Sequence, residues 1–412
     1  MPFLQNIGLL ATCTPSEGQG EIGVVPNAGL VWQDGIVQWV GAARDLPAEY
    51  VGEPVWDGAG KLVVPGLVDC HTHLAFGGWR ADEFADRIRG RDYLEIARDG
   101  GGIASTVKAT RSMDEEALRD RARNFAHEMV KLGITTVEAK SGYGLNQETE
   151  IRQLRVYEQL AREGPVRFSS TCLAAHVVPP EFQDDREAYL RLIVDEILPV
   201  VAEEGLATFC DVFVEESAFS VEEARCVLEV GQTLGLASKL HADQLSSCGG
   251  AELAAELGAV SADHLECISA EGMVALSEAG VVGVTLPLAT LYLNQSPPPV
   301  REMIDAGVSI AVATDFNPGT APSYHLPLAM TIACARQRMT PAEVLKGATR
   351  YAARALGREG EIGSLEPDAF ADFALIDAPS VEHWLYQFQA NSCIATVVDG
   401  VLQAGDIEGA AS

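Results

Sequence analysis

Two histidines separated by one residue, His71 and His73, follow an apolar run that reads LVVPGLVDC. Residues i and i+2 of a strand face the same side, so both imidazoles can point toward one metal ion. Three further residues able to bind metal or transfer protons follow later apolar runs, namely His241, His264 and Asp315. An HxH pair alone is equally consistent with two polar residues at a strand end, but the whole set predicts a metal centre.

We assign His71, His73, His241 and Asp315 as the metal ligands. Three imidazoles and one carboxylate suit Zn²⁺ or Fe³⁺ and leave a position open for water. The metal would lower the pKa of that water, so that hydroxide forms near neutral pH. His264 is expected just outside the metal shell, as an acid–base or carbonyl-polarising group. The set therefore predicts a hydrolase with one Zn²⁺ or Fe³⁺ per chain.

The remaining histidines and one lysine have different expected roles. His176 follows the third apolar run and is predicted to face the pocket, whereas His127, His325 and His383 are predicted to be structural or surface residues. Some barrel hydrolases bridge two metals with a carboxylated lysine. Here Lys140 falls on the second predicted strand and the fourth contains no lysine, so one metal is predicted rather than two.

The elements that must position these residues are eight apolar runs alternating with helical stretches, which predict a closed (β/α)₈ TIM barrel. In this fold the carboxyl ends of the strands carry the active site. The Gly-rich segment 76–106, after the first run, is expected to cover the barrel mouth. The eight runs are LVVPGLVDCHTHL, GITTVEAKSGYG, VRFSSTCLAAHVV, TFCDVFVEES, LASKLHADQ, GAVSADHLE, GVVGVTLP and VSIAVATDFNPG.

Both chain ends read as short strands broken by Gly, Pro and Asp, which predicts one small composite β-sandwich domain formed from both ends. The expected domains are 1–62 as its N-terminal part, 63–362 as the hydrolase barrel and 363–412 as its C-terminal part.

The charge balance is strongly acidic, with 29 basic and 59 acidic residues and a net charge of -30. This argues against nucleic-acid binding, and an anionic substrate would need a local cationic anchor. No apolar run is long enough to cross a membrane. Nine cysteines without a CxxC pair favour reduced thiols in a cytoplasm. We therefore expect a cytoplasmic protein that acts on a small molecule.

Several segments resemble the amidohydrolase superfamily, namely VVPGLVDCHTHL and GSLEPDAFADFALID. Within it, nearly the whole chain is similar to the imidazolonepropionase family, through HTHLAFGGWRADEF, GGGIASTVKATR, VEAKSGYGL, HADQLSSCGGAELAAELGAVSADHLE and ATDFNPGT. The resemblance implies hydrolysis of the lactam C–N bond of 4-imidazolone-5-propanoate to N-formimidoyl-L-glutamate, in histidine degradation. It also implies a mononuclear zinc or iron site and a cytoplasmic homodimer.

The resemblance further implies a set of substrate contacts, and Arg80 among them suits the propionate because arginine grips carboxylates in a fork. The alternative for Arg80 is a surface residue paired with Asp82 or Glu83. Some family members carry Glu where this chain has Gln244, which cannot ionise. Proton transfer would then pass to His264 or Asp315, or be unnecessary. The implied contacts are Arg80, Tyr143, His176, Gln244, Asn317, Gly319 and Thr320.

Two other functions fit the sequence less well. A related purine or pyrimidine deaminase typically places Glu three residues after the fifth-strand histidine, where this chain has Gln244. A barrel relative that has become an assembly protein would be marked by lost metal ligands, and all of those assigned above are present.

Overall fold

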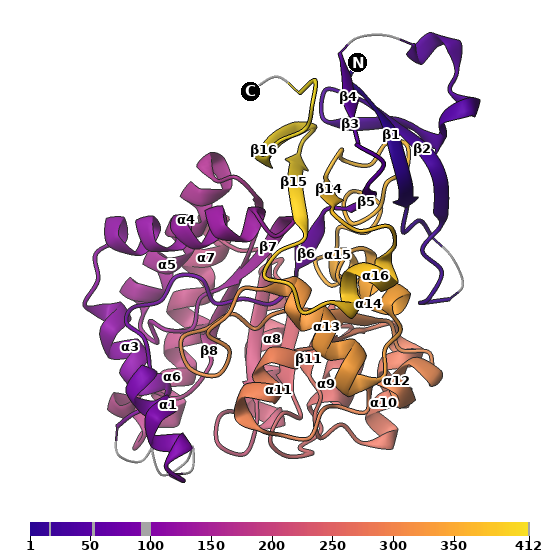
Figure 1. Ribbon diagram of the computed structural model, residues 1–412. Helices are drawn as coiled ribbons and strands as arrows, with labels where there is room; N and C mark the ends of the chain where they lie inside the picture. Colours follow the sequence, from indigo (N-terminus) through magenta and orange to yellow (C-terminus); the bar gives the residue numbers. More distant parts are fainter. Residues whose placement is uncertain (16–17, 52–53, 92–99, 411–412) are drawn as a thin grey trace.

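The computed structural model describes residues 1–412 except 16–17, 52–53, 92–99 and 411–412. Eight parallel strands form one sheet in chain order, from the first barrel strand to the last, with helices around it (Figure 1). This confirms the expected (β/α)₈ barrel. The barrel strands are β6 (Leu67–Asp69), β7 (Ile134–Lys140), β8 (Arg167–Ala175), β9 (Phe209–Val214), β10 (Ala237–Ala242), β11 (Ser261–His264), β12 (Val282–Thr285) and β13 (Ile310–Val312).

The seam between β6 and β13 lies just past the carboxyl ends of both strands. Thr72 and Phe316 form a parallel bridge there. The Asp315 amide donates to the His71 carbonyl at 3.0 Å, and the His73 amide donates to the Phe316 carbonyl at 2.9 Å. The segments that close the barrel are therefore the segments that carry three of the assigned metal ligands.

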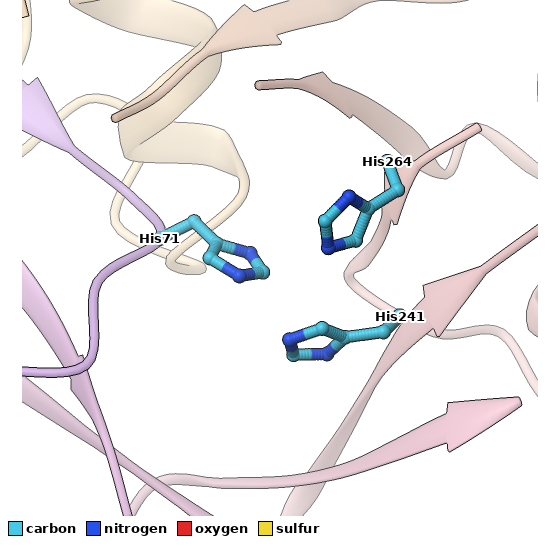
Figure 2. A group of neighbouring side chains, drawn as sticks. All are labelled: His71, His241 and His264. Carbon is cyan, nitrogen blue, oxygen red and sulfur yellow. The ribbon is translucent and has the colours of Figure 1, made fainter. Parts of the chain in front are cut away.

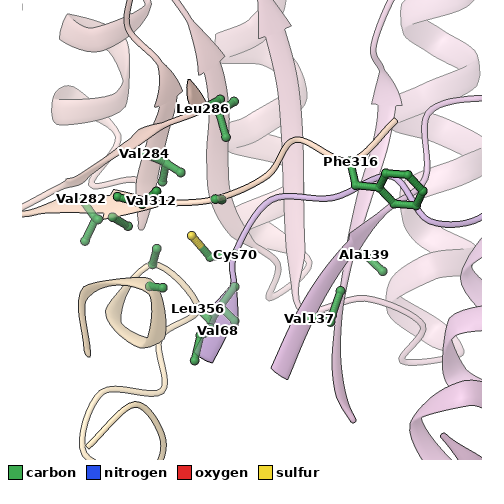
Figure 3. Close-up of a cluster of buried hydrophobic side chains, with 14 of the residues drawn as sticks. Val68, Cys70, Val137, Ala139, Val282, Val284, Leu286, Val312, Phe316 and Leu356 are labelled. Carbon is green, nitrogen blue, oxygen red and sulfur yellow. The ribbon is translucent and has the colours of Figure 1, made fainter. Parts of the chain in front are cut away.

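Helices follow the strands along the chain and pack apolar faces against the barrel. Helix α5, for example, buries Leu154, Tyr157 and Leu160. Apolar strand residues complete the core in Figure 3, including Val68, Val137 and Val284. The described α-helices are α1 (Ala81–Ile88), α3 (Ile103–Arg111), α4 (Glu115–Val130), α5 (Gln147–Glu163), α6 (Arg186–Arg191), α7 (Leu198–Glu203), α8 (Val221–Thr233), α9 (Gly250–Glu256), α10 (Ala270–Ala279), α11 (Pro287–Leu293), α12 (Val300–Asp305), α13 (Leu326–Gln337), α14 (Pro341–Gly347), α15 (Arg350–Arg354) and α16 (Val381–Tyr386).

A second sheet joins both ends of the chain, as expected for the composite β domain. It has an apolar core of its own, in which the centroid of the Trp32 ring lies 4.8 Å from that of Trp56 and 5.4 Å from that of Phe373. The domain limits expected at residues 62 and 363 stay a prediction. The strands of this sheet are β1 (Phe3–Ala11), β2 (Val24–Gln33), β3 (Ile36–Ala42), β4 (Val55–Asp57), β5 (Leu62–Pro65), β14 (Phe373–Ile376), β15 (Cys393–Val398) and β16 (Val401–Gly405).

The run expected to be the first barrel strand serves both sheets. Its first half, β5, pairs with β1 and β14 of the small sheet, whereas its second half, β6, pairs with β7 of the barrel. Gly66 separates the two halves, and a Cβ there would lie 2.2 Å from the Thr135 hydroxyl. Only glycine therefore fits at the point where the chain passes from one sheet to the other.

The segment expected over the barrel mouth is described in part. Arg80, just before α1, and Ile103, at the start of α3, both line the cavity at the mouth. Residues 92–99 of this segment lie outside the described residues. Within the described part of the chain, no helix combines the length and apolar character needed to cross a bilayer.

A buried ion pair joins the small sheet to the bottom of the barrel, and it gives a test of the composite architecture. Arg167, which begins β8, donates from Nε to Asp372 at 2.9 Å, directly before β14. Because Asp372 is buried, Arg167→Leu would leave a charge unpaired, and we expect a loss of about 3–5 kcal/mol in the free energy of unfolding.

Urea denaturation measures this loss, and the chain offers a matched control. Arg155 also pairs with a carboxylate, that of Glu204, but both of these side chains are exposed to solvent. Arg155→Leu should cost less than about 1 kcal/mol. Equal losses in the two variants would contradict a stabilising role for the buried pair.

Candidate active site

Five polar side chains converge at the carboxyl end of the barrel. His71 and His73 lie just past β6, His241 is the penultimate residue of β10, His264 ends β11, and Asp315 follows β13. All five are at most 3% exposed. Figure 2 shows the rings of His71, His241 and His264 turned toward one another across the barrel. The structure thus brings together every residue that the sequence analysis placed at or beside a metal.

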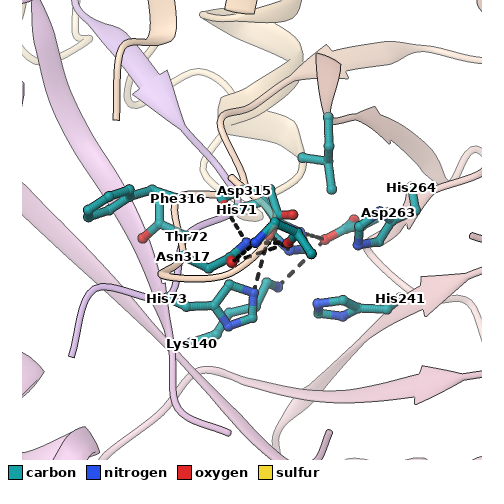
Figure 4. A network of polar contacts seen from close by, with 12 residues as sticks. His71, Thr72, His73, Lys140, His241, Asp263, His264, Asp315, Phe316 and Asn317 are labelled. Carbon is teal, nitrogen blue, oxygen red and sulfur yellow. Dashed lines mark hydrogen bonds and ion pairs between the residues drawn. The ribbon is translucent and has the colours of Figure 1, made fainter. Parts of the chain in front are cut away.

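These side chains form two overlapping groups that could hold a metal ion. One group is His71, His241 and His264, and the other is His71, His73 and Asp315, each with its ligand atoms within 4.8 Å of one another. Asp315 Oδ1 lies 3.5 Å from Nε2 of both His71 and His73 (Figure 4). His264 thus belongs to one of the two candidate groups, together with His71 and His241.

The hydrogen bonding of the imidazoles fits a metal site. Nδ1 of His71 lies 2.6 Å from an Asp263 oxygen, and Nδ1 of His241 lies 3.1 Å from an Asp211 oxygen. The opposite nitrogens, Nε2 of both rings, are buried without a hydrogen-bond partner among the described residues, as is Nδ1 of His73. Buried polar atoms without partners are costly, and metal-binding histidines typically donate their other N–H to a carboxylate.

Beneath the histidines lies a fully buried ionic cluster. Lys140, the last residue of β7, donates from Nζ to Glu138 and to Asp211, at 2.7 Å in each case, and lies 3.5 Å from Asp263. Lys239 adds a second positive charge 3.5 Å from Glu138. The Lys140 ammonium is thus held by carboxylates, and it connects the two carboxylates that orient His71 and His241.

The charges of this cluster and its burial also shift the pKa values of the neighbouring aspartate and histidine side chains. Burial alone would raise the pKa of Asp211, but His241 and Lys140 hold it well below its usual range. Burial likewise holds the pKa of His241 well below its ordinary value. His71 differs: burial and Lys140 lower its pKa, but the hydrogen bond to Asp263 and the nearby negative charge of Asp315 outweigh them and raise it to about 9. A metal would find His241 neutral and would have to displace a proton from His71.

A cavity of about 720 Å³ opens above this group. Gly319, the one implied substrate contact outside the lining, packs against Arg80, because a Cβ there would lie 2.0 Å from the guanidinium. Of the implied substrate contacts, the cavity is lined by Arg80, Tyr143, His176, Gln244, Asn317 and Thr320.

Arg80 combines the two environments considered for it. Its Nε donates to Glu83 at 2.8 Å, as in a surface ion pair. Its side chain is nevertheless only 5% exposed and lines the cavity. The guanidinium is therefore a buried cation at the wall of the site.

His176 and Tyr143 form the wall beside His73. The ring of His176 stacks on that of His73 with centroids 5.4 Å apart, and the Tyr143 ring lies 5.4 Å from His176. His176 Nδ1 lies 3.0 Å from the Gly142 carbonyl, which fixes the ring. Burial lowers the pKa of His176 to about 3, so the imidazole is neutral.

The loop after β13 is shaped by Asn317. Its side-chain oxygen accepts from the amides of Gly319 and Thr320, at 2.8 and 2.7 Å, and its amide donates to the Asp315 carbonyl at 2.7 Å. Asp315 itself has a positive φ of 56° and His264 one of 79°. Such backbone strain in residues other than glycine is typical of functional sites.

The histidines predicted to be structural or surface residues lie away from the cavity. His127 on α4 and His383 on α16 are exposed. His325 caps α13, where its Nδ1 accepts from the Leu328 amide at 3.0 Å.

Sequence reasoning missed the residues behind the histidines, namely Glu138, Asp211, Lys239, Asp263 and Glu266. Each lies within or just beyond an otherwise apolar run, and a charged residue in a fully buried strand is rarely there without a partner. That signal was available, but it does not identify the partner.

A sequence model of the amidohydrolase family matches residues 62–402 of this chain. Three curated relatives, all called imidazolonepropionase, are similar along most of their length. The relative from Geobacillus thermodenitrificans is 47% identical, and the similar region spans 91% of this chain and 89% of the relative. The relative from Fusobacterium nucleatum is 44% identical over 97% of this chain and 98% of the relative. The relative from Shewanella frigidimarina is 42% identical over 94% of this chain and 95% of the relative.

Solved structures share the fold. An ochratoxinase from A. niger superposes with a TM-score of 0.72 at 19% identity, with 98% of this chain and 96% of that chain covered. An atrazine chlorohydrolase from Arthrobacter aurescens TC1, complexed with zinc, superposes with a TM-score of 0.69 at 16% identity, with 98% of this chain and 95% of that chain covered. At these identities the likeness shows the architecture alone. The family match and the curated relatives show that the chain belongs to the amidohydrolase family, among its imidazolonepropionases.

Proposed function

We propose that this chain hydrolyses the lactam C–N bond of 4-imidazolone-5-propanoate and releases N-formimidoyl-L-glutamate. The observation that carries the proposal is a buried arginine, Arg80, in the same cavity as the histidine and aspartate group. The curated relatives supply the substrate class, and the cavity has the features that such a substrate requires: a cation for the propionate and a polar centre for the lactam.

We further propose His71, His73, His241 and Asp315 as ligands of one Zn²⁺ or Fe³⁺ ion. The unpartnered ring nitrogens of the three histidines support this set. The ion would supply Lewis-acid activation of water, which makes hydroxide accessible near neutral pH. The Lys140 ammonium donates hydrogen bonds to Glu138 and Asp211, so this lysine is not available to bridge two metal ions after carboxylation. This supports a site with a single ion.

The chain's own residues would bind and orient the substrate. Arg80 would hold the propionate in a charge-assisted pair, and Tyr143 would add a hydroxyl to the same carboxylate or to the ring. His176, a neutral imidazole beside His73, would contact the ring face. With the carboxylate fixed at one wall, the lactam carbonyl is directed toward the polar group at the cavity floor.

Proton transfer falls to Asp315 and His264, since Gln244 lines the cavity but cannot ionise. Burial opposes the charge of Asp315, yet His71 and His73 hold its pKa well below the usual range, so it is ionised. It would accept the proton from the attacking water and pass it to the ring nitrogen as the C–N bond breaks. His264, whose pKa burial lowers to about 4, is neutral and would polarise the carbonyl or assist the transfer.

A purine or pyrimidine deaminase is the weaker candidate. Its proton shuttle would be expected where this chain carries Gln244, and the curated relatives favour the lactam hydrolase. The homodimer and the cytoplasmic location implied by the resemblance stay predictions.

Metal binding can be tested at two ligands from different strands. His71→Ala and His241→Ala should each remove most of the bound metal and nearly abolish turnover, because each deletes one of four ligands. Elemental analysis of the purified variants measures this directly. His383→Ala, at an exposed histidine on α16, is the matched control and should retain metal. Full occupancy in both site variants would contradict the ligand assignment, and two ions per parent chain would contradict the mononuclear site.

His264→Asn separates a ligand from an acid–base group. We expect this variant to keep its metal but to lose kcat by about 10²-fold, the usual scale for a lost proton-transfer or polarising group. Metal analysis and steady-state kinetics on the same preparation give both values. An unchanged kcat would exclude His264 from the reaction, and loss of the metal would make it a ligand instead.

Arg80→Met tests the carboxylate anchor. It should raise KM strongly and lower kcat/KM by roughly 10²-fold with the metal intact, because a charge-assisted contact contributes about 1.5–3 kcal/mol. Arg80→Lys should recover part of the loss, since it keeps the charge without the fork. Glu83→Gln removes the ion pair alone and controls for disturbance of the loop. Kinetics equal to the parent in Arg80→Met would place the anchor elsewhere.

A further inference from the structure

Glu266 is a buried carboxyl that the proposed reaction does not use. It lies two residues after His264, its side chain is 3% exposed, and it is not part of the cavity lining. One oxygen, Oε1, accepts a hydrogen bond at 2.8 Å from the hydroxyl of Thr290 on α11. Glu266 is thus anchored by Thr290, which, like Glu266, does not line the cavity.

Its other oxygen faces His264. Oε2 of Glu266 lies 3.8 Å from Nδ1 of His264. Both atoms are buried, and within the described part of the chain neither has a hydrogen-bond partner. Two buried, unpartnered polar atoms of complementary type are unfavourable apart and favourable together. A hydrogen bond needs an approach to about 3.2 Å, and such contacts often tighten only when substrate binds.

The neighbouring histidines show the same arrangement already formed. Nδ1 of His71 meets a buried carboxylate of Asp263 at 2.6 Å, and Nδ1 of His241 meets Asp211 at 3.1 Å. The pair of His264 and Glu266 is a third case at the same end of the barrel. In each case a buried carboxylate faces Nδ1 of the ring, and Figure 2 shows the three rings turned toward one another.

We propose that Glu266 is a positioning residue for His264. Its carboxylate accepts a hydrogen bond from the Nδ1–H group of His264, which favours the tautomer whose Nε2 is unprotonated and faces the cavity. This rests on the proposed function only in that His264 takes part in the reaction. This tautomer suits an Nε2 that accepts a proton or binds the ion, and it excludes Nε2 as a hydrogen-bond donor to the lactam carbonyl. Glu266 acts through the ring and touches no substrate.

The tautomer can be observed without any substrate. We would label histidine with ¹⁵N and record long-range ¹H–¹⁵N spectra of the zinc-loaded protein, assigning His264 by its absence in His264→Asn. Burial raises the pKa of the Glu266 carboxyl to about 7, so the spectra belong near pH 8.5, where it is ionised. The parent should show a protonated Nδ1, and Glu266→Leu should lose that preference. An identical tautomer in the parent and in Glu266→Leu would overturn the proposal.

Kinetics then test whether Glu266 acts through His264. Glu266→Leu should lower kcat about 10-fold with little change in KM, and Glu266→Gln, which keeps an acceptor oxygen, should recover part of that loss. In a His264→Asn background the Glu266→Leu change should have no further effect, because coupled residues are not additive. Independent, multiplying losses would overturn the proposal. A parent that fails to open imidazolonepropionate would contradict the proposed function, while the spectra would still decide the role of Glu266.

Discussion

The buried contact between the Lys140 ammonium and the carboxylates of Asp211 and Asp263 is the constraint on which the site depends. Each of these carboxylates faces the Nδ1 of one histidine, Asp211 toward His241 and Asp263 toward His71. Burying such charges costs several kcal/mol per ion unless they compensate one another. The cluster is therefore weak evidence for stability, but its geometry orients two imidazoles from opposite parts of the chain.

The site is also linked to the closure of the barrel. The segments after β6 and β13 pair through backbone hydrogen bonds, and those segments carry His71, His73 and Asp315. Below them, the buried Asp69 carboxylate accepts from the amide and hydroxyl of Thr314, at 3.0 and 2.6 Å. A change in the pairing at this seam would therefore displace His71, His73 and Asp315 together.

Much of this arrangement is predictable from sequence for a simple reason. Parallel strands with connecting helices bring all their carboxyl ends to one face, so polar residues that end apolar runs must meet there. His71, His241 and Asp315 meet for that reason. The same logic does not say which residue faces which. Asp263, next to His264 in sequence, pairs with His71 across the barrel, because this depends on strand register and barrel closure.

Other features are not predictable from sequence because they depend on the local conformation of the backbone. The run through Gly66 reads as one strand but divides between two sheets. Glu266 would share a face with His264 in a regular strand, yet the strand ends at His264, and positive φ values of 79° and 70° at His264 and Leu265 set the direction of the carboxyl. For Arg80 the sequence left a surface ion pair as the alternative to a place in the site, and its burial depends on packing such as that of Gly319 against it.

The most direct measurement is hydrolysis of imidazolonepropionate by the purified, metal-analysed protein in H₂¹⁸O, with the product examined by mass spectrometry. Attack of water on the lactam carbonyl predicts N-formimidoyl-L-glutamate with one ¹⁸O in the newly formed carboxylate and no release of ammonia. Failure to consume imidazolonepropionate, or release of ammonia in place of the ring-opened product, would contradict the account.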